Sequence, residues 1–201
     1  MSENLVIIGV AAGAFIGTNL DNLLLLVTLR ARYERQTRSV TAGYVTGMIV
    51  IGFIAVLIGK VGDFIPLAYL GLLGVVPMTM GVLALSKLFL KSDTGQAVSS
   101  ATPESPLAVF STLVSTQLSN GTDTILAFSM LLADSKDTAD YFLVPTFLAM
   151  IGVFSGLAYY LLKNGKLSRV LNRYGQYVTP VILILVGIYI LSNTATDLVP
   201  G

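Results

Sequence analysis

Six long apolar runs alternate with short polar stretches along the chain of 201 residues. A helix needs about 20 residues to cross the roughly 30 Å of hydrocarbon in a bilayer. Uninterrupted apolar segments, such as residues 23–27 and 181–186, do not alternate as the strands of a membrane β-barrel do. The pattern therefore predicts an all-α integral membrane protein with six transmembrane helices. The predicted helices cover residues 4–29, 40–60, 66–90, 106–133, 141–162 and 176–196.

The overall composition excludes several classes of function. Hydrophobic residues make up 54% of the chain and charged residues 11%, with no cysteine and no histidine. Disulfides, thiolate or imidazole metal sites and catalysis by either residue are therefore excluded. Basic residues do not cluster among aromatic ones, and no phosphate loop, zinc-protease helix or nucleophile elbow is present. We expect a protein of the lipid bilayer that is not an enzyme, has no cofactor and binds no nucleic acid.

Basic residues predict how the chain lies in the membrane. The first three residues carry no basic group and the apolar run that follows is too long for a signal peptide, so we expect the first helix to be retained. Lysine and arginine concentrate in the odd-numbered connections, at Arg30, Arg32, Arg35, Arg38, Lys87, Lys91, Lys163, Lys166, Arg169 and Arg173. Cytoplasmic loops carry such an excess. We therefore predict the inner (cytoplasmic) membrane, with both termini extracytoplasmic.

A polar linker divides the chain into two halves that resemble each other. Residues 92–105 are rich in Ser, Thr and Pro and are expected to be cytoplasmic, and three predicted helices lie on each side, in residues 1–91 and 106–201. Asn19 aligns with Asn120, and the string GVLALS at residues 81–86 aligns with GIYILS at residues 187–192. Because each half has an odd number of helices, the second half enters from the opposite face. This predicts two inverted three-helix repeats, whose site lies near the midplane.

The two matching polar motifs are the candidate functional site. An ionised Asp at the centre of a bilayer costs roughly 2.5–3.5 kcal/mol, so two of them indicate a positively charged ligand. The predicted charged ligands are Asp21 and Asp123, and the predicted neutral ligands are Asn19, Asn22 and Asn120. Secondary candidates are Thr18, Ser119, Thr122 and Thr124.

Oxygen ligands of this kind favour a divalent cation. A rotation of about 100° per residue brings Thr18, Asp21 and Asn22 to one helix face, with Asn19 at its margin. Two such faces would form an all-oxygen cage with two negative charges, typical of magnesium, calcium and manganese sites. Gly121 is expected to let the fourth helix unwind there. Two alternatives remain open: protonated acids that only hydrogen-bond neighbouring helices, and a proton relay without metal.

Three pairs of glycines four residues apart predict close helix packing. Such pairs let two helix backbones approach each other. They are Gly13 and Gly17, Gly43 and Gly47, and Gly152 and Gly156. Packing within the chain is the favoured interpretation. Packing between two copies would instead give a homodimer.

Four segments of the chain form a recognisable set of motifs: residues 18–22 (TNLDN), 69–81 (YLGLLGVVPMTMG), 120–123 (NGTD) and 174–191 (YGQYVTPVILILVGIYIL). Together they resemble the bacterial cadmium resistance transporter family, within the lysine-exporter superfamily. The motifs differ from the family pattern at Asn22, Thr122 and Thr124, where further acids, glycine or amides are usual. The resemblance covers nearly the whole chain and implies export of divalent metal, nominally cadmium, from the cytoplasm.

These observations predict a secondary transporter for divalent metal. Buried carboxylates tend to hold protons, and a metal displaces protons from its ligands, so proton antiport follows as a hypothesis. One alternative is an exporter of a small organic cation or an amino acid, which other members of the superfamily suggest. Another is a membrane subunit that transports nothing itself.

Overall fold

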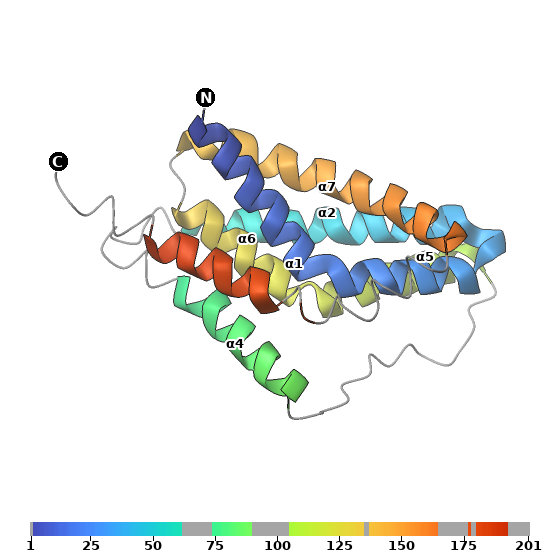
Figure 1. The fold of residues 1–201 in the computed structure, drawn as a ribbon. Coiled ribbons are helices and arrows are strands. Elements are labelled where there is room, and N and C mark those ends of the chain that lie inside the picture. The colour runs from blue at the N-terminus through green and yellow to red at the C-terminus, as the bar shows by residue number, and fades with distance from the viewer. Residues whose placement is uncertain are drawn as a thin grey trace, which may run out of the picture.

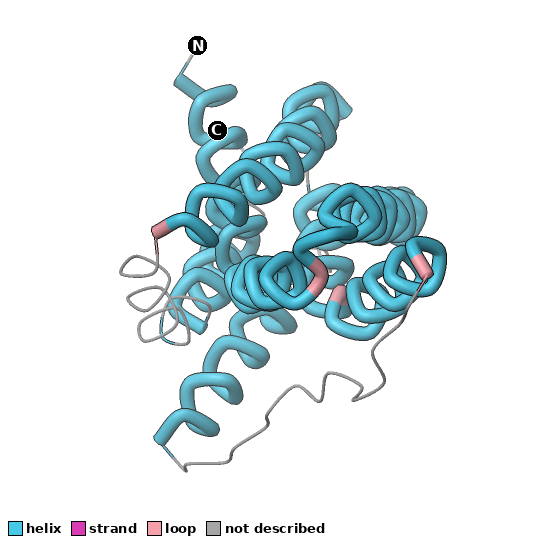
Figure 2. Tube along the Cα trace, turned by 90° about the vertical axis from the view of Figure 1, so that its right-hand side faces the viewer, coloured by secondary structure: helices cyan, strands magenta, loops and turns pink. Residues whose placement is uncertain are grey.

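The computed structural model describes residues 2–61, 74–89, 105–134, 137–164, 177 and 180–192, and these residues are almost entirely helical (Figures 1 and 2). The helices, in chain order, are α1 (Ser2–Arg32), the 3₁₀ turn η1 (Glu34–Gln36), α2 (Thr37–Val61), α4 (Val75–Phe89), α5 (Pro106–Asn120), α6 (Thr122–Asp134), α7 (Asp137–Lys163) and a last helix, Pro180–Ser192. The prediction of an all-α chain is confirmed for the part that is described.

Three of the described helices are long and apolar enough to cross a bilayer. They span Leu5–Arg32, Glu34–Val61 and Tyr141–Lys163, which correspond to the first, second and fifth predicted helices. The third and sixth predicted helices are described only as α4 and the last helix, and their remaining residues lie outside the described ranges. The predicted linker lies outside them too, except for Ser105. The count of six crossings therefore stays a prediction.

The fourth predicted helix is interrupted at the expected glycine. Helix α5 ends at Asn120 and α6 begins at Thr122, with Gly121 between them at φ −81° and ψ −1°. The amide of Ile125 donates to the Gly121 carbonyl at 2.9 Å, which restarts the helical pattern. A Cβ atom at Gly121 would collide with the side chain of Ile51 on α2. The glycine therefore lets the side chain of Ile51 pack directly against the interrupted helix.

Helix α2 lies along α5 and α6, and α1 lies along α7 (Figure 1). Small residues make the first of these contacts close. A Cβ atom at Gly43 would lie 2.6 Å from the Cβ of Leu113, and one at Gly47 would lie 2.6 Å from the Cβ of Gln117. Each step of four residues on α2 matches a step of four on α5, so the two helices run in the same direction. The Gly43 and Gly47 pair therefore packs within the chain, as favoured from the sequence.

The other two glycine pairs behave differently. Gly17 is buried and lies against Ile182 of the last helix, whereas a Cβ atom at Gly13 would have no neighbour within 4 Å among the described residues. Gly152 and Gly156 are exposed on α7, and an added Cβ there also meets nothing within 4 Å in the described part of the chain. These two glycines do not serve packing between the described helices.

Helix α4 and the last helix approach each other closely and run in opposite directions. A Cβ atom at Gly74 would lie 2.6 Å from the carbonyl oxygen of Gly187. A Cβ atom at Gly81 would lie 2.6 Å from the carbonyl oxygen of Pro180. From the first contact to the second, the position on α4 advances by seven residues and the position on the last helix goes back by seven. The two helices are therefore antiparallel, and their backbones touch over two turns.

An aromatic cluster joins α1, α6 and α7 in the core. Phe15 meets Phe128, Phe147 and Phe154 edge to face, with ring centroids 6.4, 5.2 and 5.0 Å apart, and Phe128 lies 4.7 Å from Phe147. Such edge-to-face pairs add about 0.5–1.5 kcal/mol each beyond the burial of their area. The cluster fixes which face of α1 points inward.

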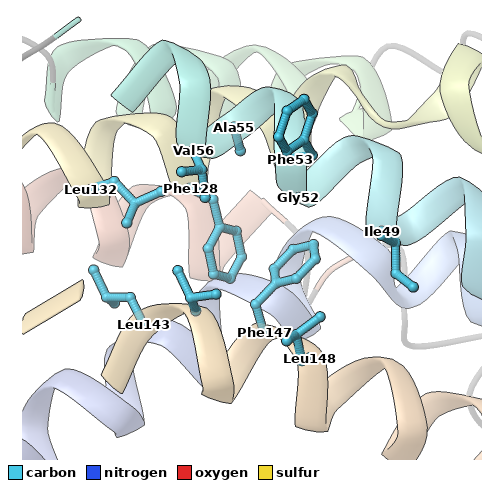
Figure 3. A pocket seen from close by; sticks show the side chains of 11 residues that line it. Ile49, Gly52, Phe53, Ala55, Val56, Phe128, Leu132, Leu143, Phe147 and Leu148 are labelled. Carbon is cyan, nitrogen blue, oxygen red and sulfur yellow. The ribbon is translucent and has the colours of Figure 1, made fainter. Parts of the chain in front are cut away.

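Beside this cluster lies an apolar pocket of about 200 Å³ between α2, α6 and α7 (Figure 3). Phe128 and Phe147 point into it, and the partly exposed Ile49, Phe53 and Leu148 lie along its rim (Figure 3). All of its lining residues are apolar or glycine. The pocket therefore offers no side-chain oxygen to a cation, and the polar motifs must be considered separately.

The close approach at Gly47 leads to a test of stability. In Gly47→Ala, the new methyl group meets the Cβ of Gln117 rather than the end of a flexible side chain. We expect this overpacking to destabilise the protein by about 1–3 kcal/mol. Gly152→Ala is the control, because its methyl group meets nothing within 4 Å among the described residues. Thermal unfolding of the detergent-solubilised variants measures the difference, and equal midpoints would contradict the observed packing.

Candidate functional site

The first polar motif lies on α1, and three of its side chains are buried. Thr18 is 3% exposed, and Asn19 and Asn22 are fully buried, whereas Asp21 is exposed. The sequence predicted that Asp21 shares the inner face and that Asn19 lies at its margin. The structure reverses these two positions. Phe15 sets the inward direction of α1, and Asp21 lies about 120° around the helix from it.

Hydrogen bonds connect the buried side chains of this motif. Asn19 Nδ2 donates to the Phe15 carbonyl at 3.1 Å and to Thr18 Oγ1 at 2.9 Å. Asn22 Nδ2 donates to Asn19 Oδ1 at 3.1 Å. Asp21 Oδ1 accepts from the backbone amide of Asn22 at 3.1 Å. These bonds hold the two amide side chains in fixed orientations, with Asn22 Oδ1 left over as an acceptor.

The second motif surrounds the break between α5 and α6. Asn120 and Asp123 are half-buried, Thr124 is fully buried, and Ser119 and Thr122 are exposed. Asp123 lies in the first turn of α6, where the unpaired backbone amides of the helix favour a carboxylate. A carboxylate held at this break also lies next to the last carbonyl groups of α5, which are short of intrahelical partners.

The two motifs lie at the same depth in the bundle. Helices α1 and α6 are in contact, and Phe15 of α1 meets Phe128 of α6. Figure 1 shows that α1 runs in the opposite direction to α5 and α6. Asn22 lies two turns after Phe15 on α1, and Gly121 lies two turns before Phe128 on the antiparallel α5 and α6. This brings Asn22 level with Gly121, in the middle of the second motif.

Several polar atoms here are buried without a hydrogen-bond partner in the described part of the chain. They are Asn22 Oδ1, Thr124 Oγ1 and both amide atoms of Gln117. Leaving such an atom unpaired costs about 1–3 kcal/mol. Among the described residues, no three acidic side chains lie close enough to hold a metal ion together. Any cation held here must therefore depend on neutral oxygens as well as carboxylates.

Residues 15–198 match the family model for cadmium resistance transporters. The chain belongs to the cadmium resistance transporter family. The comparisons with curated proteins and with solved structures found no match. Membership in a family of transporters and the apolar helices together make this chain a membrane transport protein.

Two residues of this cadmium resistance transporter were missed by the sequence analysis. Gln117 is fully buried on α5, on the same face as Gly121 and Thr124. The available signal was the spacing of seven residues between Gln117 and Thr124, which places both on one helix face. Arg30 was considered only as an orientation signal, yet its side chain is 4% exposed.

Arg30 joins three helices at one end of the transporter. Its guanidinium donates to the Ser155 carbonyl at 2.7 Å, to Ser155 Oγ at 3.0 Å and to Thr41 Oγ1 at 2.7 Å. Arg30 lies in the last turn of α1, Thr41 lies in the second turn of α2 and Ser155 belongs to α7. Local sequence gives no hint of this contact, because Ser155 lies 125 residues further along the chain.

Arg30→Met should therefore lower stability. The variant keeps an apolar chain of similar length but removes three hydrogen bonds of a charged group, and such a bond contributes about 1.5–3 kcal/mol. Arg35→Met is the control, because Arg35 is exposed and the same charge is lost. Thermal unfolding in detergent compares the two. An equal effect of both variants would mean that the buried contacts add nothing.

Proposed function

We propose that this member of the family exports a divalent cation, cadmium or a similar ion, across the cytoplasmic membrane in exchange for protons. The observation that carries the proposal is the buried Asn22 Oδ1, which has no partner in the described part of the chain and is level with the break beside Asp123. An uncoordinated oxygen at the level of a carboxylate is suited to a cation. Carboxylate and amide oxygens are the ligands that calcium ions and divalent cations of similar size prefer in proteins.

We further propose that the chain is built of two inverted repeats of three crossings. The glycine contacts support this symmetry. The offset of 106 residues that aligns GVLALS with GIYILS carries Gly74 to Pro180 and Gly81 to Gly187. If the two halves are exchanged by this symmetry, the contact of Gly74 with Gly187 is converted into a contact of Pro180 with Gly81. Both contacts are present. The pairing of α1 with α7 likewise becomes the pairing of α2 with α5 and α6.

The same symmetry suggests how the two motifs correspond. Aligning Asn19 with Asn120 carries Asn22 to Asp123 and Asp21 to Thr122. Burial supports this register, because Asp21 and Thr122 are both exposed, whereas Asn22 and Asp123 are both at least half-buried. In the proposed site, Asp123 and Asn22 are the inner pair of ligands, flanked by Asn19, Asn120 and Thr124. Asp21 acts at the margin, where it attracts the cation and supplies the second carboxylate.

Protons are the proposed coupling ion. A carboxylate at the centre of a bilayer is costly when ionised and alone, so Asp123 is expected to hold a proton when no cation is bound. Cation binding displaces that proton. With the orientation predicted from the basic residues, the cation leaves the cytoplasm and protons enter.

Metal flux in proteoliposomes tests the proposed function. We expect uptake of Cd²⁺ into inside-acid vesicles to exceed uptake without a pH gradient, and Mg²⁺ to be a poor substrate because it holds its water tightly and demands a strict octahedron. Flux that ignores the pH gradient would contradict proton exchange. Transport of an organic cation or an amino acid, but not of metal, would support the alternative exporter. No flux of any of these would indicate a subunit without transport of its own.

A further inference from the structure

We propose that Gln117 is a further ligand of the transported cation and helps to determine which cations are accepted. This inference rests on the proposed function, since it assigns one more residue to the same ion path. Gln117 is among the largest fully buried side chains of the described residues. Both of its amide atoms lack a hydrogen-bond partner in the described part of the chain.

The backbone around Gln117 explains why the side chain is held there. Its Cβ and Cγ lie against Gly47 of α2, where a Cβ atom would approach them to 2.6 and 3.0 Å. The absence of a side chain at position 47 makes room for the aliphatic part of the glutamine. An apolar residue would fill this space without leaving two polar atoms unpaired, so packing alone does not require an amide.

The position of Gln117 places it on one side of the proposed inner ligands. Gln117 lies one turn before Gly121 and Thr124 lies one turn after it, on the same face of the interrupted helix. Both are fully buried and both carry unpartnered oxygens. Seven residues of helix correspond to a rise of about 10.5 Å. Oxygens at such spacing on either side of a helix break form a series of positions through which a cation passes while it loses water.

The direction of approach follows from the ends of the helices. Gln117 lies between the break and the start of α5 at Pro106, which is the end where Arg30 joins α1, α2 and α7. By the predicted orientation this end is cytoplasmic. A cation that enters from the cytoplasm therefore meets the Gln117 carbonyl oxygen before it reaches Asn22 and Asp123. A neutral oxygen there replaces water on a large divalent ion more easily than on magnesium.

Two substitutions of Gln117 with opposite expected effects test this inference. Gln117→Leu removes the oxygen at similar volume, and KM for Cd²⁺ should rise by roughly tenfold, the scale of one lost contact to a charged group. Gln117→Glu keeps an oxygen and adds a charge, so KM should fall while the maximal rate also falls because release is slower. Leu113→Met is the control one turn away, at a fully buried position against Gly43, and should change neither value.

Thermal unfolding completes the test. Because the amide has no partner in the described part of the chain, Gln117→Leu should unfold at the wild-type temperature or above it. A Gln117→Leu protein that fails to accumulate, or that has the wild-type KM, overturns the inference. If Asp123→Asn then abolishes flux while Gln117→Leu does not, only the role of Gln117 is refuted. A wild-type protein that moves no metal refutes both this role and the proposed function.

Discussion

Asp123→Asn should reduce Cd²⁺ flux by roughly 30-fold or more while leaving insertion and abundance unchanged. Asparagine has nearly the same shape, so the break between α5 and α6 keeps its packing against α2. What is lost is the negative charge beside the cation. Removing one partner of a buried charge pair costs about 2–5 kcal/mol, and each 1.4 kcal/mol is a factor of ten in binding. Initial rates in proteoliposomes and calorimetric titration of the purified protein measure the loss.

The control for this variant lies on the same helix. Asp134→Asn removes an equal charge at the other end of α6, three turns away from the break, and should leave Cd²⁺ binding unchanged. Asp21→Asn should also reduce transport, but by less than Asp123→Asn, because Asp21 is exposed. Unchanged Cd²⁺ binding in both Asp21→Asn and Asp123→Asn would show that the cation is bound elsewhere.

Long apolar runs made the described helices α1, α2 and α7 predictable from the sequence. Each run exceeds the length needed to cross a bilayer, and a continuous apolar segment in lipid has few alternatives to a helix. The break at Gly121 was predictable as well, because glycine in a membrane helix permits local unwinding. The connection between Val61 and Gly74 lies outside the described residues, so the third crossing remains a prediction.

The rotation of α1 was not predictable in the same way. Helical periodicity gives the angles between Thr18, Asn19, Asp21 and Asn22, but it does not say which direction faces the core. That direction is set by the contacts of Phe15 with rings on α6 and α7, more than 100 residues further along the chain. The charge of Asp21 made it the expected inner residue, whereas the packing buries the neutral Asn19 instead.

Buried polar residues outside the motifs were missed for a related reason. Gln117 follows Ser115 and Thr116 in a stretch with several hydroxyl side chains and no acid, so its composition resembles that of a surface segment. Its full burial depends on Gly47 of α2, which leaves room for its side chain. Arg30 resembles any arginine at the end of a membrane helix, and only the distant Ser155 makes it a structural residue. Both cases depend on contacts between helices that are far apart in sequence.

Moving the carboxylate from one repeat to the other should restore transport. If Asn22 and Asp123 are equivalent positions about one inner site, then Asn22→Asp combined with Asp123→Asn keeps the total charge of the site. It only moves the carboxylate from α6 to α1. Asn22 is fully buried and its Oδ1 is unpartnered in the described part of the chain, so one carboxylate oxygen takes an existing place. The other oxygen replaces Nδ2 and loses the donation to Asn19 Oδ1, which is the expected cost of the exchange. We expect the double variant to recover Cd²⁺ flux to within about tenfold of wild type, a remaining cost of about 1.4 kcal/mol.

Asn19→Asp combined with Asp123→Asn is the matched control for this exchange. It places an equal charge on the same helix at a position that is also fully buried, but Asn19 corresponds to Asn120 in the repeat and its Oδ1 already accepts from Asn22. This control should stay as inactive as Asp123→Asn alone. Equal recovery in both double variants would mean that the cation responds only to total charge. Recovery in the control alone would require a different register between the repeats, because the geometry of the site then depends on Asn19 rather than on Asn22.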